Sequence, residues 1–261
     1  MRCLVISLFT SVLLAGVAFA GPGDDSGNST AVQPADQKST AQAAGDHGKV
    51  GFGVKASLLG VGAEVALRAT HRSNVRVGFN ILGYSRDFEK DGINYDGHLN
   101  FRTVEAHYDI FPWAHSFHIS PGVLTYIGTP VTAHALVPGD QSFSLGGVDY
   151  SSDPNHPASA SGTVKFNRVA PMITMGFGNL VHRDSKHFTV PFEIGVAFQG
   201  APVSNLSVAG NVCDEPGLNC RNAATDPTVQ SNIIEEQNKI NNSMRWFKVY
   251  PIISVGFGYK F

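Results

Sequence analysis

The chain has 261 residues, of which 15% are charged, and its formal net charge is −2. This near-neutral balance gives no electrostatic case for binding nucleic acid. Beyond residue 20, no stretch approaches the about 18 to 20 consecutive apolar residues of a transmembrane helix. The remaining chain is therefore either soluble or crosses a membrane as a β-barrel, and its 28 Gly and 17 Phe, which often alternate, favour the barrel.

The first twenty residues have the pattern of a secretory signal peptide. Arg2 gives a positive start, Leu4–Val17 is almost continuously apolar, and Ala18-Phe19-Ala20 fits the small-x-small rule of a cleavage site. We expect cleavage after Ala20 and export of the rest. Residues 21–49 are rich in Gly, Ser, Ala, Gln and Asp, a composition that buries too little apolar surface to order itself. They predict a flexible periplasmic N-terminal extension, followed by a barrel domain at 50–261.

From Val50 onward, apolar residues alternate with polar or small ones, which is the period of a β-strand with two different faces. The predicted strands cover residues 50–58, 63–70, 75–81, 99–110, 117–123, 169–178, 188–199 and 247–261. The alternation changes phase near Thr103 and Val104, which predicts a β-bulge.

The predicted connections alternate between short and long. Residues 71–74, 111–116 and 180–187 form short turns, whereas residues 86–97, 128–162 and 200–245 form long polar loops. Outer-membrane barrels have short periplasmic turns and long extracellular loops. The tight turn around Gly60 is the exception, because it falls on the long-loop side. We predict an all-β fold, an antiparallel transmembrane barrel of eight strands.

The strand count depends on residues 128–162. Val131–Val137 and Ser142–Ser152 either form a hairpin that extends above the membrane or join the wall and make ten strands. We favour eight strands with the extended hairpin. Thr225–Arg245 has neither Gly nor Pro after Pro227 and predicts one short helix in the last long loop. Cys213 and Cys220 lie in the exported part of the chain and predict a local disulfide.

The chain ends in Gly256-Phe257-Gly258-Tyr259-Lys260-Phe261, with three aromatic residues on one face of the last strand. This pattern resembles the C-terminal signal of bacterial outer-membrane proteins, which implies recognition by the barrel assembly machinery. Together with the strands and loops, residues 50–261 resemble small outer-membrane barrels such as the transmembrane domain of OmpA and OmpW. The resemblance implies a monomer in the bacterial outer membrane, in contact with its lipid and without a cofactor.

Charged side chains lie on the face opposite the apolar one. In an eight-stranded barrel, inward side chains meet across the axis, and buried charges need partners. We therefore predict a lumen plugged by an ion-pair network and a structural or surface-interaction role. A narrow porin-like or OmpW-like channel for ions or small solutes is the alternative. The expected inward charged residues are Lys55, Glu64, Arg68, Arg76, Arg102, Glu105, His107, Asp109, Lys165, Glu193 and Lys248.

An outer-membrane lipid-modifying enzyme or protease is a further alternative. It would use His with Ser or Asp near the outer rim. The candidates are His98, His134 and His156, with Asp96, Asp149 and Asp153 close in sequence. Polar loops bring such residues together by chance, so we expect no enzyme. His115 and His118 have the spacing of a metal pair only on a helix, and the Pro112-Trp113 turn argues against one.

A third class of protein, a soluble periplasmic β-sandwich, is also open. Such a protein would be extracted without detergent.

Overall fold

The computed structural model describes residues 49–113, 116–183 and 187–261. The expected signal peptide with its cleavage site at Ala20, nearly all of the N-terminal extension, and His115 lie outside the described residues. Residues 49–261 belong to one compact unit of the chain.

Eight antiparallel strands close into a barrel, as predicted. Each strand pairs with the next around the ring, and the pairing of β16 with β1 and of β5 with β4 completes it. The short strand β11 (Phe188–Thr189) also pairs with β16. The strands of the wall are β1 (Val50–Ser57), β2 (Gly60–Thr70), the first half of β3 (Ser73–Lys90), the second half of β4 (Ile93–Ile110), β5 (Phe117–Tyr126), β10 (Val169–Phe177), β12 (Phe192–Phe198) and β16 (Val249–Lys260).

The outside of the barrel is apolar, as the alternating pattern predicts. On β1, Phe52 and Val54 are exposed whereas Gly53 and Lys55 are buried, and the other wall strands repeat this alternation. Exposed Phe, Val and Ile side chains lie on wall strands from β1 to β16. Such a surface suits the hydrocarbon of a membrane. Among the described residues, the helical part of the chain has no segment with the length and apolar character of a transmembrane helix.

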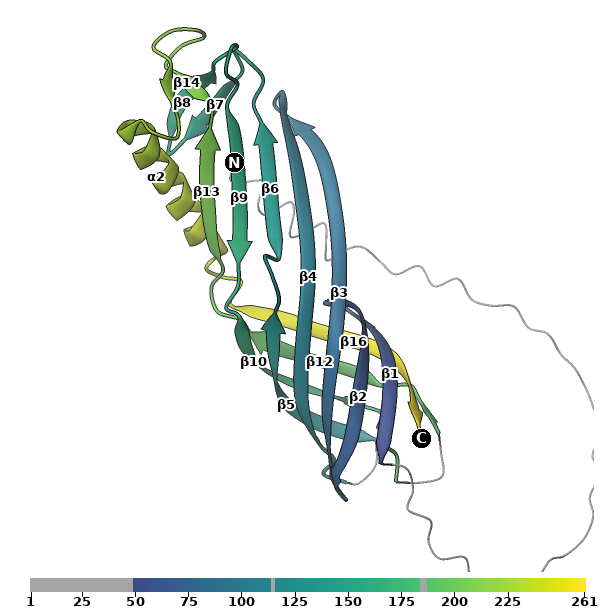
Figure 1. Ribbon diagram of the computed structural model, residues 1–261. Helices are drawn as coiled ribbons and strands as arrows, with labels where there is room; N and C mark the ends of the chain where they lie inside the picture. The colour runs from purple at the N-terminus through teal and green to yellow at the C-terminus, as the bar shows by residue number, and fades with distance from the viewer. Residues whose placement is uncertain (1–48, 114–115, 184–186) are drawn as a thin grey trace, which may run out of the picture. The chain divides into compact units, whose positions relative to one another are not determined.

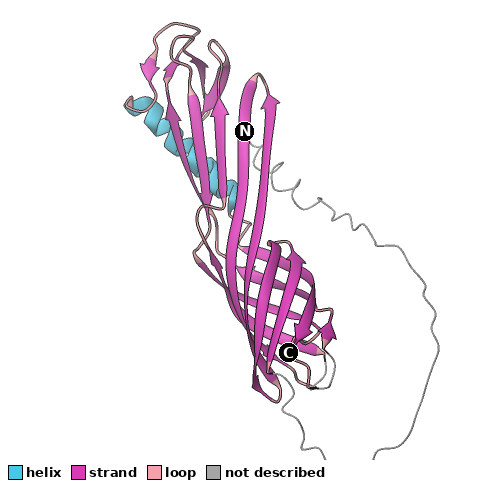
Figure 2. Ribbon diagram, turned by 45° about the vertical axis from the view of Figure 1, so that its right-hand side comes forward, coloured by secondary structure: helices cyan, strands magenta, loops and turns pink. Residues whose placement is uncertain are grey.

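Strands β3 and β4 run well beyond the barrel, so the expected polar loop at 86–97 is wrong. Their pairing is unbroken from Ser73–Ile110 to Lys90–Ile93, and a two-residue turn, Asp91-Gly92, joins them. Both turn residues have positive φ, 54° and 74°, which is the backbone of a type I′ hairpin turn and explains the Asp-Gly sequence. Figures 1 and 2 show this long antiparallel hairpin extending away from the barrel.

A second region, which we call the head, is built on this hairpin. Strands β6 (Val131–Leu136), β9 (Ser159–Lys165) and β13 (Val203–Ala209) extend the sheet sideways from β4 in the order β13-β9-β6-β4-β3. Residues 131–152 therefore lie outside the eight-stranded wall, as expected. The expected pairing of Val131–Val137 with Ser142–Ser152 is wrong, because the free edge of β4 takes β6. Ser142–Ser152 forms its own hairpin, β7 (Ser142–Leu145) and β8 (Val148–Ser152), in a small sheet with β14 (Asn211–Cys213) and β15 (Arg221–Asn222).

Helix α2 (Pro227–Met244) confirms the helix predicted at Thr225–Arg245. Asp226 caps it by accepting hydrogen bonds from the N–H groups of Thr228 and Val229, both at 3.0 Å. The helix lies along β13 (Figure 1). Its Asn241 and Gln237 side chains accept hydrogen bonds from the N–H groups of Ser204 and Leu206, at 2.7 and 3.1 Å. The outer edge of β13 is thereby occupied by the helix.

The predicted bulge near Thr103 and Val104 is absent, because the β3–β4 register is continuous there. Arg102 consequently lies on the outer face and is exposed, while Phe101 and Thr103 point inward. Polar residues were expected to point inward, but Arg102 does not, because the barrel interior beside it is apolar. Lys165 and Lys248, also expected inside, are exposed.

Candidate functional site

The middle of the barrel interior is a layer of buried charges centred on Arg76. Its guanidinium donates to Glu64 at 3.0 Å and to both carboxylate oxygens of Asp109 at 3.1 and 3.0 Å, and it also forms an ion pair with Glu193. The β3–β4 register places Arg76 opposite His107 and two pairs away from Asp109, which is on the same face. Three carboxylates thus surround one guanidinium, a geometry in which arginine's planar donors are well matched.

A second cation, Lys55, completes the layer. Its ammonium group lies 3.2 Å from Glu64 and also forms an ion pair with Glu105. Glycines make room for these side chains. A Cβ atom on Gly78 would lie 2.8 Å from the carboxylate of Glu105, so glycine leaves the space in which this carboxylate lies.

His118 and Ser120, which sequence reasoning did not place in the lumen, also belong to this layer. Nε2 of His118 lies 2.9 Å from Glu193, and the Ser120 hydroxyl donates to Asp109 at 2.6 Å. The alternation of β5 held the signal, because an outward Phe117 implies inward His118 and Ser120. His115 lies outside the described residues, so the expectation that His115 and His118 form no metal pair is not tested.

Asp109, His118 and Glu193 hold potential metal ligand atoms within 4.8 Å of one another. Arg76, however, already contacts both carboxylates. Its guanidinium provides the positive charge that a metal ion would bring, and a metal ion placed there would be repelled by it. This cluster is therefore better described as an ion-pair network than as a metal centre.

Apolar layers lie on both sides of the charges. At the end nearer the head, Phe101 packs against Tyr126, Phe166 and Tyr250 with ring centroids 5.9 to 6.0 Å apart, and Leu59 from the β1–β2 turn joins them. At the short-turn end, Leu180 and Val181 pack with Ala66. A Cβ atom on Gly258 would lie 2.2 Å from the Leu180 side chain, so this leucine packs directly against Gly258 of β16.

The remaining predicted lumen residues lie near the barrel ends or are less well paired. Arg68 donates to the carbonyl of His182 at 3.0 Å, at the short-turn end. His107 is buried, yet neither ring nitrogen has a hydrogen bond, and Nε2 lies 3.6 Å from Glu105. The structure thus brings Lys55, Glu64, Arg76, Glu105, Asp109 and Glu193 into direct contact.

The last strand presents Phe257, Tyr259 and Phe261 on the outer face, all exposed. Tyr259 packs edge-on against Phe261, with ring centroids 5.0 Å apart. In the head, Cys213 and Cys220 form the predicted disulfide.

The head sheet has two different faces. One packs against α2 through residues such as Ala135, Ala160 and Leu206, which contact the core formed with Val229 and Ile233. On that face, burial and the nearby Asp91 carboxylate raise the pKa of Tyr95. The other face is open and carries hydroxyl, amide, carboxylate and imidazole groups.

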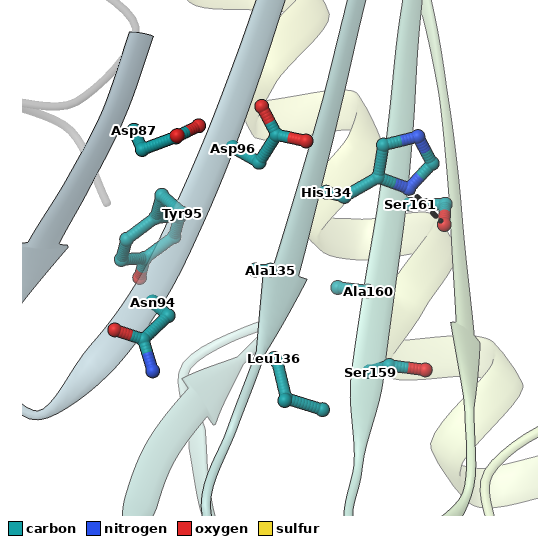
Figure 3. Close-up of a pocket in the computed structure, with 10 residues that line it drawn as sticks. All are labelled: Asp87, Asn94, Tyr95, Asp96, His134, Ala135, Leu136, Ser159, Ala160 and Ser161. Carbon is teal, nitrogen blue, oxygen red and sulfur yellow. Dashed lines mark hydrogen bonds between the residues drawn. The ribbon is translucent and has the colours of Figure 1, made fainter.

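Two of the histidines singled out from the sequence lie on the open face, His98 on β4 and His134 on β6. Asp96 and His98 are two residues apart on β4, and His134 on β6 lies directly opposite Asp96. Asp87 on β3 lies opposite Asp96 on the other side. Figure 3 shows Asp96 and His134 on the same side of the sheet, with Ser161 hydrogen-bonded to His134. Asp87, Asp96, His134 and Ser161 border a hollow of about 350 Å³, and His98 is not among the residues that line it.

Hydrogen bonds order this open face. The Ser85 hydroxyl lies 2.8 Å from Nδ1 of His98, whose Nε2 lies 3.1 Å from a carboxylate oxygen of Asp96. Serine, histidine and aspartate connect in this order in hydrolases. Here, however, the His98 and Asp96 side chains are 46% and 45% exposed, whereas such chemistry depends on a water-excluded site with preorganised donors.

The other predicted catalytic candidates lie elsewhere. His156 is exposed, with Nδ1 3.7 Å from Asp153, and Asp149 is exposed on β8. Hydrogen bonds from the Asn211 side chain and the Asn155 N–H hold the pKa of Asp153 below its usual value. Of the three histidines that the sequence offered as enzyme candidates, the structure places His98 and His134 on one face of the head and His156 elsewhere.

A closed antiparallel barrel of eight strands, apolar outside and ion-paired inside, defines the fold of the small outer-membrane β-barrel proteins. No protein-family model and no curated protein sequence matches the chain. Among solved structures, the chain is similar in fold to CarO2 of Acinetobacter baumannii, with 21% identity and a TM-score of 0.50 over 81% of this chain and 98% of that one. CarO of the same organism is 20% identical, with a TM-score of 0.48 over 81% of this chain and 97% of that one. A major outer membrane protein from Thermus thermophilus is 11% identical, with a TM-score of 0.31 over 81% and 99% of the two chains.

Proposed function

We propose that the chain is a bacterial outer-membrane protein in which a closed barrel anchors the head, and in which the head contacts molecules outside the cell. The short turns face the periplasm, and the chain is exported by its signal peptide and inserted by the barrel assembly machinery as a monomer. The wall contacts outer-membrane lipid. The role is structural or one of surface interaction and needs neither catalysis nor a cofactor.

The layered interior carries this proposal. Arg76 and Lys55 pair with four carboxylates in the middle, and apolar clusters around Phe101 and Leu180 lie above and below them. A hydrated ion would have to break the ion pairs and also pass two apolar layers. Both steps oppose conduction, because an ion loses its water in each.

Planar bilayer recording of the folded, full-length protein tests the closed barrel. We expect no stable single-channel steps, with a wide porin reconstituted in the same way as the positive control. Stable steps from the wild-type protein would overturn the proposal. Recording the Phe101→Ala variant, which thins one apolar layer, should give at most brief openings.

A narrow conduit is the second candidate, and one observation favours it. Asn80 Oδ1, Thr174 Oγ1 and both ring nitrogens of His107 are buried without hydrogen bonds. Unpaired buried polar atoms are sites where ordered water can bind. If the interior conducts, Asn80→Leu and Thr174→Val should lower the conductance, whereas the exposed substitution Thr70→Val should leave it unchanged.

Membrane fractionation tests the location. We expect the protein in the outer-membrane fraction, extracted only with detergent, with a gel mobility that changes on heating. N-terminal sequencing should place the start of the mature chain at Gly21. A soluble protein without heat-modifiable mobility would contradict both the location and the barrel's role as an anchor.

A further inference from the structure

We propose that Asp96, His98 and His134 form a binding site for a divalent transition-metal ion such as Zn²⁺ or Cu²⁺ on the open face of the head. This inference deepens the proposed surface role by naming what the head binds, and it does not require that the barrel be closed. It begins with register. Side chains two residues apart on a strand share a face, so Asp96 and His98 point the same way, and His134 stands directly opposite Asp96.

The donor atoms suit such an ion. Two imidazole nitrogens and a carboxylate are the ligands that zinc and copper prefer, whereas Ca²⁺ and Mg²⁺ prefer oxygen alone. Nε2 of His98 and the facing Asp96 oxygen are 3.1 Å apart. Two ligands of one tetrahedral zinc ion lie about 3.4 Å apart when each bond is about 2.1 Å. The Asp96–His98 pair is therefore already close to the separation that a shared ion needs.

Both histidines are held by serines in the same manner. Nδ1 of His98 lies 2.8 Å from Ser85 Oγ, and Nδ1 of His134 lies 3.0 Å from Ser161 Oγ. A metal-binding histidine usually has its second nitrogen fixed by such an outer partner. In the part of the chain that the structure describes, Nε2 of His134 has no partner. His134 is exposed, so a change in its side-chain torsions can turn a ring nitrogen toward Asp96, which releases its contact with Ser161.

The charge around the proposed site is negative, which favours the binding of a cation. Asp87 and Asp96 are directly opposed across β3 and β4, and like charges in that position destabilise a sheet. Neither carboxylate has a lysine or arginine partner within the described ranges, and the Oδ1 atom of Asp96 is shielded from solvent without a hydrogen bond. The hollow beside them has a volume of about 350 Å³ and is lined by no lysine or arginine. This is the opposite of the barrel interior, where Arg76 already neutralises the clustered carboxylates.

Copper binding to the folded, full-length protein in detergent, without an affinity tag, is the test. We expect one Cu²⁺ per chain by calorimetry at neutral pH, with nitrogen hyperfine lines from two imidazoles in the electron paramagnetic resonance spectrum. His98→Gln and His134→Gln should each weaken binding at least about tenfold and remove one nitrogen from the spectrum. Ser85→Ala should weaken it by up to about tenfold, the lower range for loss of an outer partner, whereas Ser161→Ala should not weaken it.

His156→Gln is the matched control, because His156 is an exposed head histidine that lies outside β4 and β6 and pairs with Asp153. It should leave affinity and spectrum unchanged, and heat-modifiable gel mobility should show that all variants fold. Unchanged binding in both His98→Gln and His134→Gln would overturn the site, as would the absence of binding in the wild type. Conductance is recorded separately, so a conducting barrel with an intact copper site would reject only the closed interior.

Discussion

Arg76 donates from Nε and Nη2 to the two carboxylate oxygens of Asp109, at 3.1 and 3.0 Å, inside the barrel. The same guanidinium contacts Glu64 and Glu193. Replacing it by an apolar side chain leaves three carboxylates facing one another without their shared cation.

We therefore expect Arg76→Met to lower the free energy of unfolding by about 3 to 5 kcal/mol, the range for removing one partner of a buried ion pair. Urea unfolding in detergent, followed by gel mobility, measures the change. Arg72→Met, in an exposed turn of the same barrel, should stay within about 0.5 kcal/mol of the wild type. Equal effects of the two substitutions would show that the charged layer does not hold the barrel together.

Gly176 marks a close approach between β10 and β12. A Cβ atom there would lie 2.2 Å from the carbonyl oxygen of Phe192, whereas a Cβ atom on Gly83 would meet nothing within 4 Å. Gly176→Ala should lower the free energy of unfolding by about 1 to 3 kcal/mol, as overpacking does. Gly83→Ala should be neutral or slightly stabilising. The same urea titration compares them, and a tolerated Gly176→Ala would mean that the two strands separate easily.

The disulfide between Cys213 and Cys220 closes a short loop in the head. A loop of this length is expected to lose about 2 to 3 kcal/mol of local stability on reduction. Reducing agent should therefore expose residues 213–220 to protease while the heat-modifiable mobility of the barrel stays the same. Cleavage sites are read by mass spectrometry, and the Cys213→Ser, Cys220→Ser double variant should no longer respond to the reductant.

Asp153 makes one part of the head sensitive to acid. It accepts hydrogen bonds from the Asn211 side chain and the Asn155 N–H, at 3.0 and 2.9 Å, and these hold its pKa below the usual value. Its stabilising contribution is fully present above the unfolded-state pKa of about 3.9. It is lost as the pH falls through the lower pKa of the folded state.

Hydrogen exchange around residues 153–156 should therefore accelerate as the pH falls below about 4, beyond the intrinsic pH dependence of exchange. Asp153→Asn should abolish this extra dependence. Asp149→Asn, on the same small sheet, should retain it. An extra dependence that survives Asp153→Asn would assign it to another group.

Phe261 tests the proposed contact with the assembly machinery. It is 68% exposed on the outer face, much like Phe177 at 61%. We expect Phe261→Ser to reduce the folded protein in cell membranes several-fold, but to refold from urea into detergent as well as Phe177→Ser does. If both variants assemble equally in cells, the last aromatic residue is only a lipid contact.

The barrel could be predicted from the sequence because alternation reports directly on its two faces. On a strand such as β1, one face carries outward residues such as Phe52 and the other carries lumen residues such as Lys55. Because the two surroundings differ so much, apolar and polar residues alternate clearly. Arg102 marks the limit of this reasoning. At the level of Arg102 the interior is filled by Phe101 and Tyr126. Arg102 therefore points outward, and the rule that polar residues face the lumen assigns it to the wrong face of the strand.

The head was not predictable by the same means. Its open face carries residues such as Ser85 and Thr132, which are as polar as a loop, and its strands pair across long separations in sequence. Local signals did predict the helix at Thr225–Arg245 and the disulfide between Cys213 and Cys220. Asp91-Gly92 is the local signal of a hairpin turn, which the expected loop at 86–97 left unused. His98 and His134 are brought together by the β4–β6 register, which no local pattern records.

The hydrogen bonds from Ser204 and Leu206 of β13 to helix α2 bear on how the molecules behave when crowded. A sheet with free edges invites the strand of a neighbour. At one edge of the head the helix already satisfies backbone donors. The other, residues 82–90 of β3, has no strand beside it within the described chain, but it carries Arg86, Asp87, Glu89 and Lys90. Neighbouring copies in a dense membrane should therefore remain separate rather than merge into a continuous sheet.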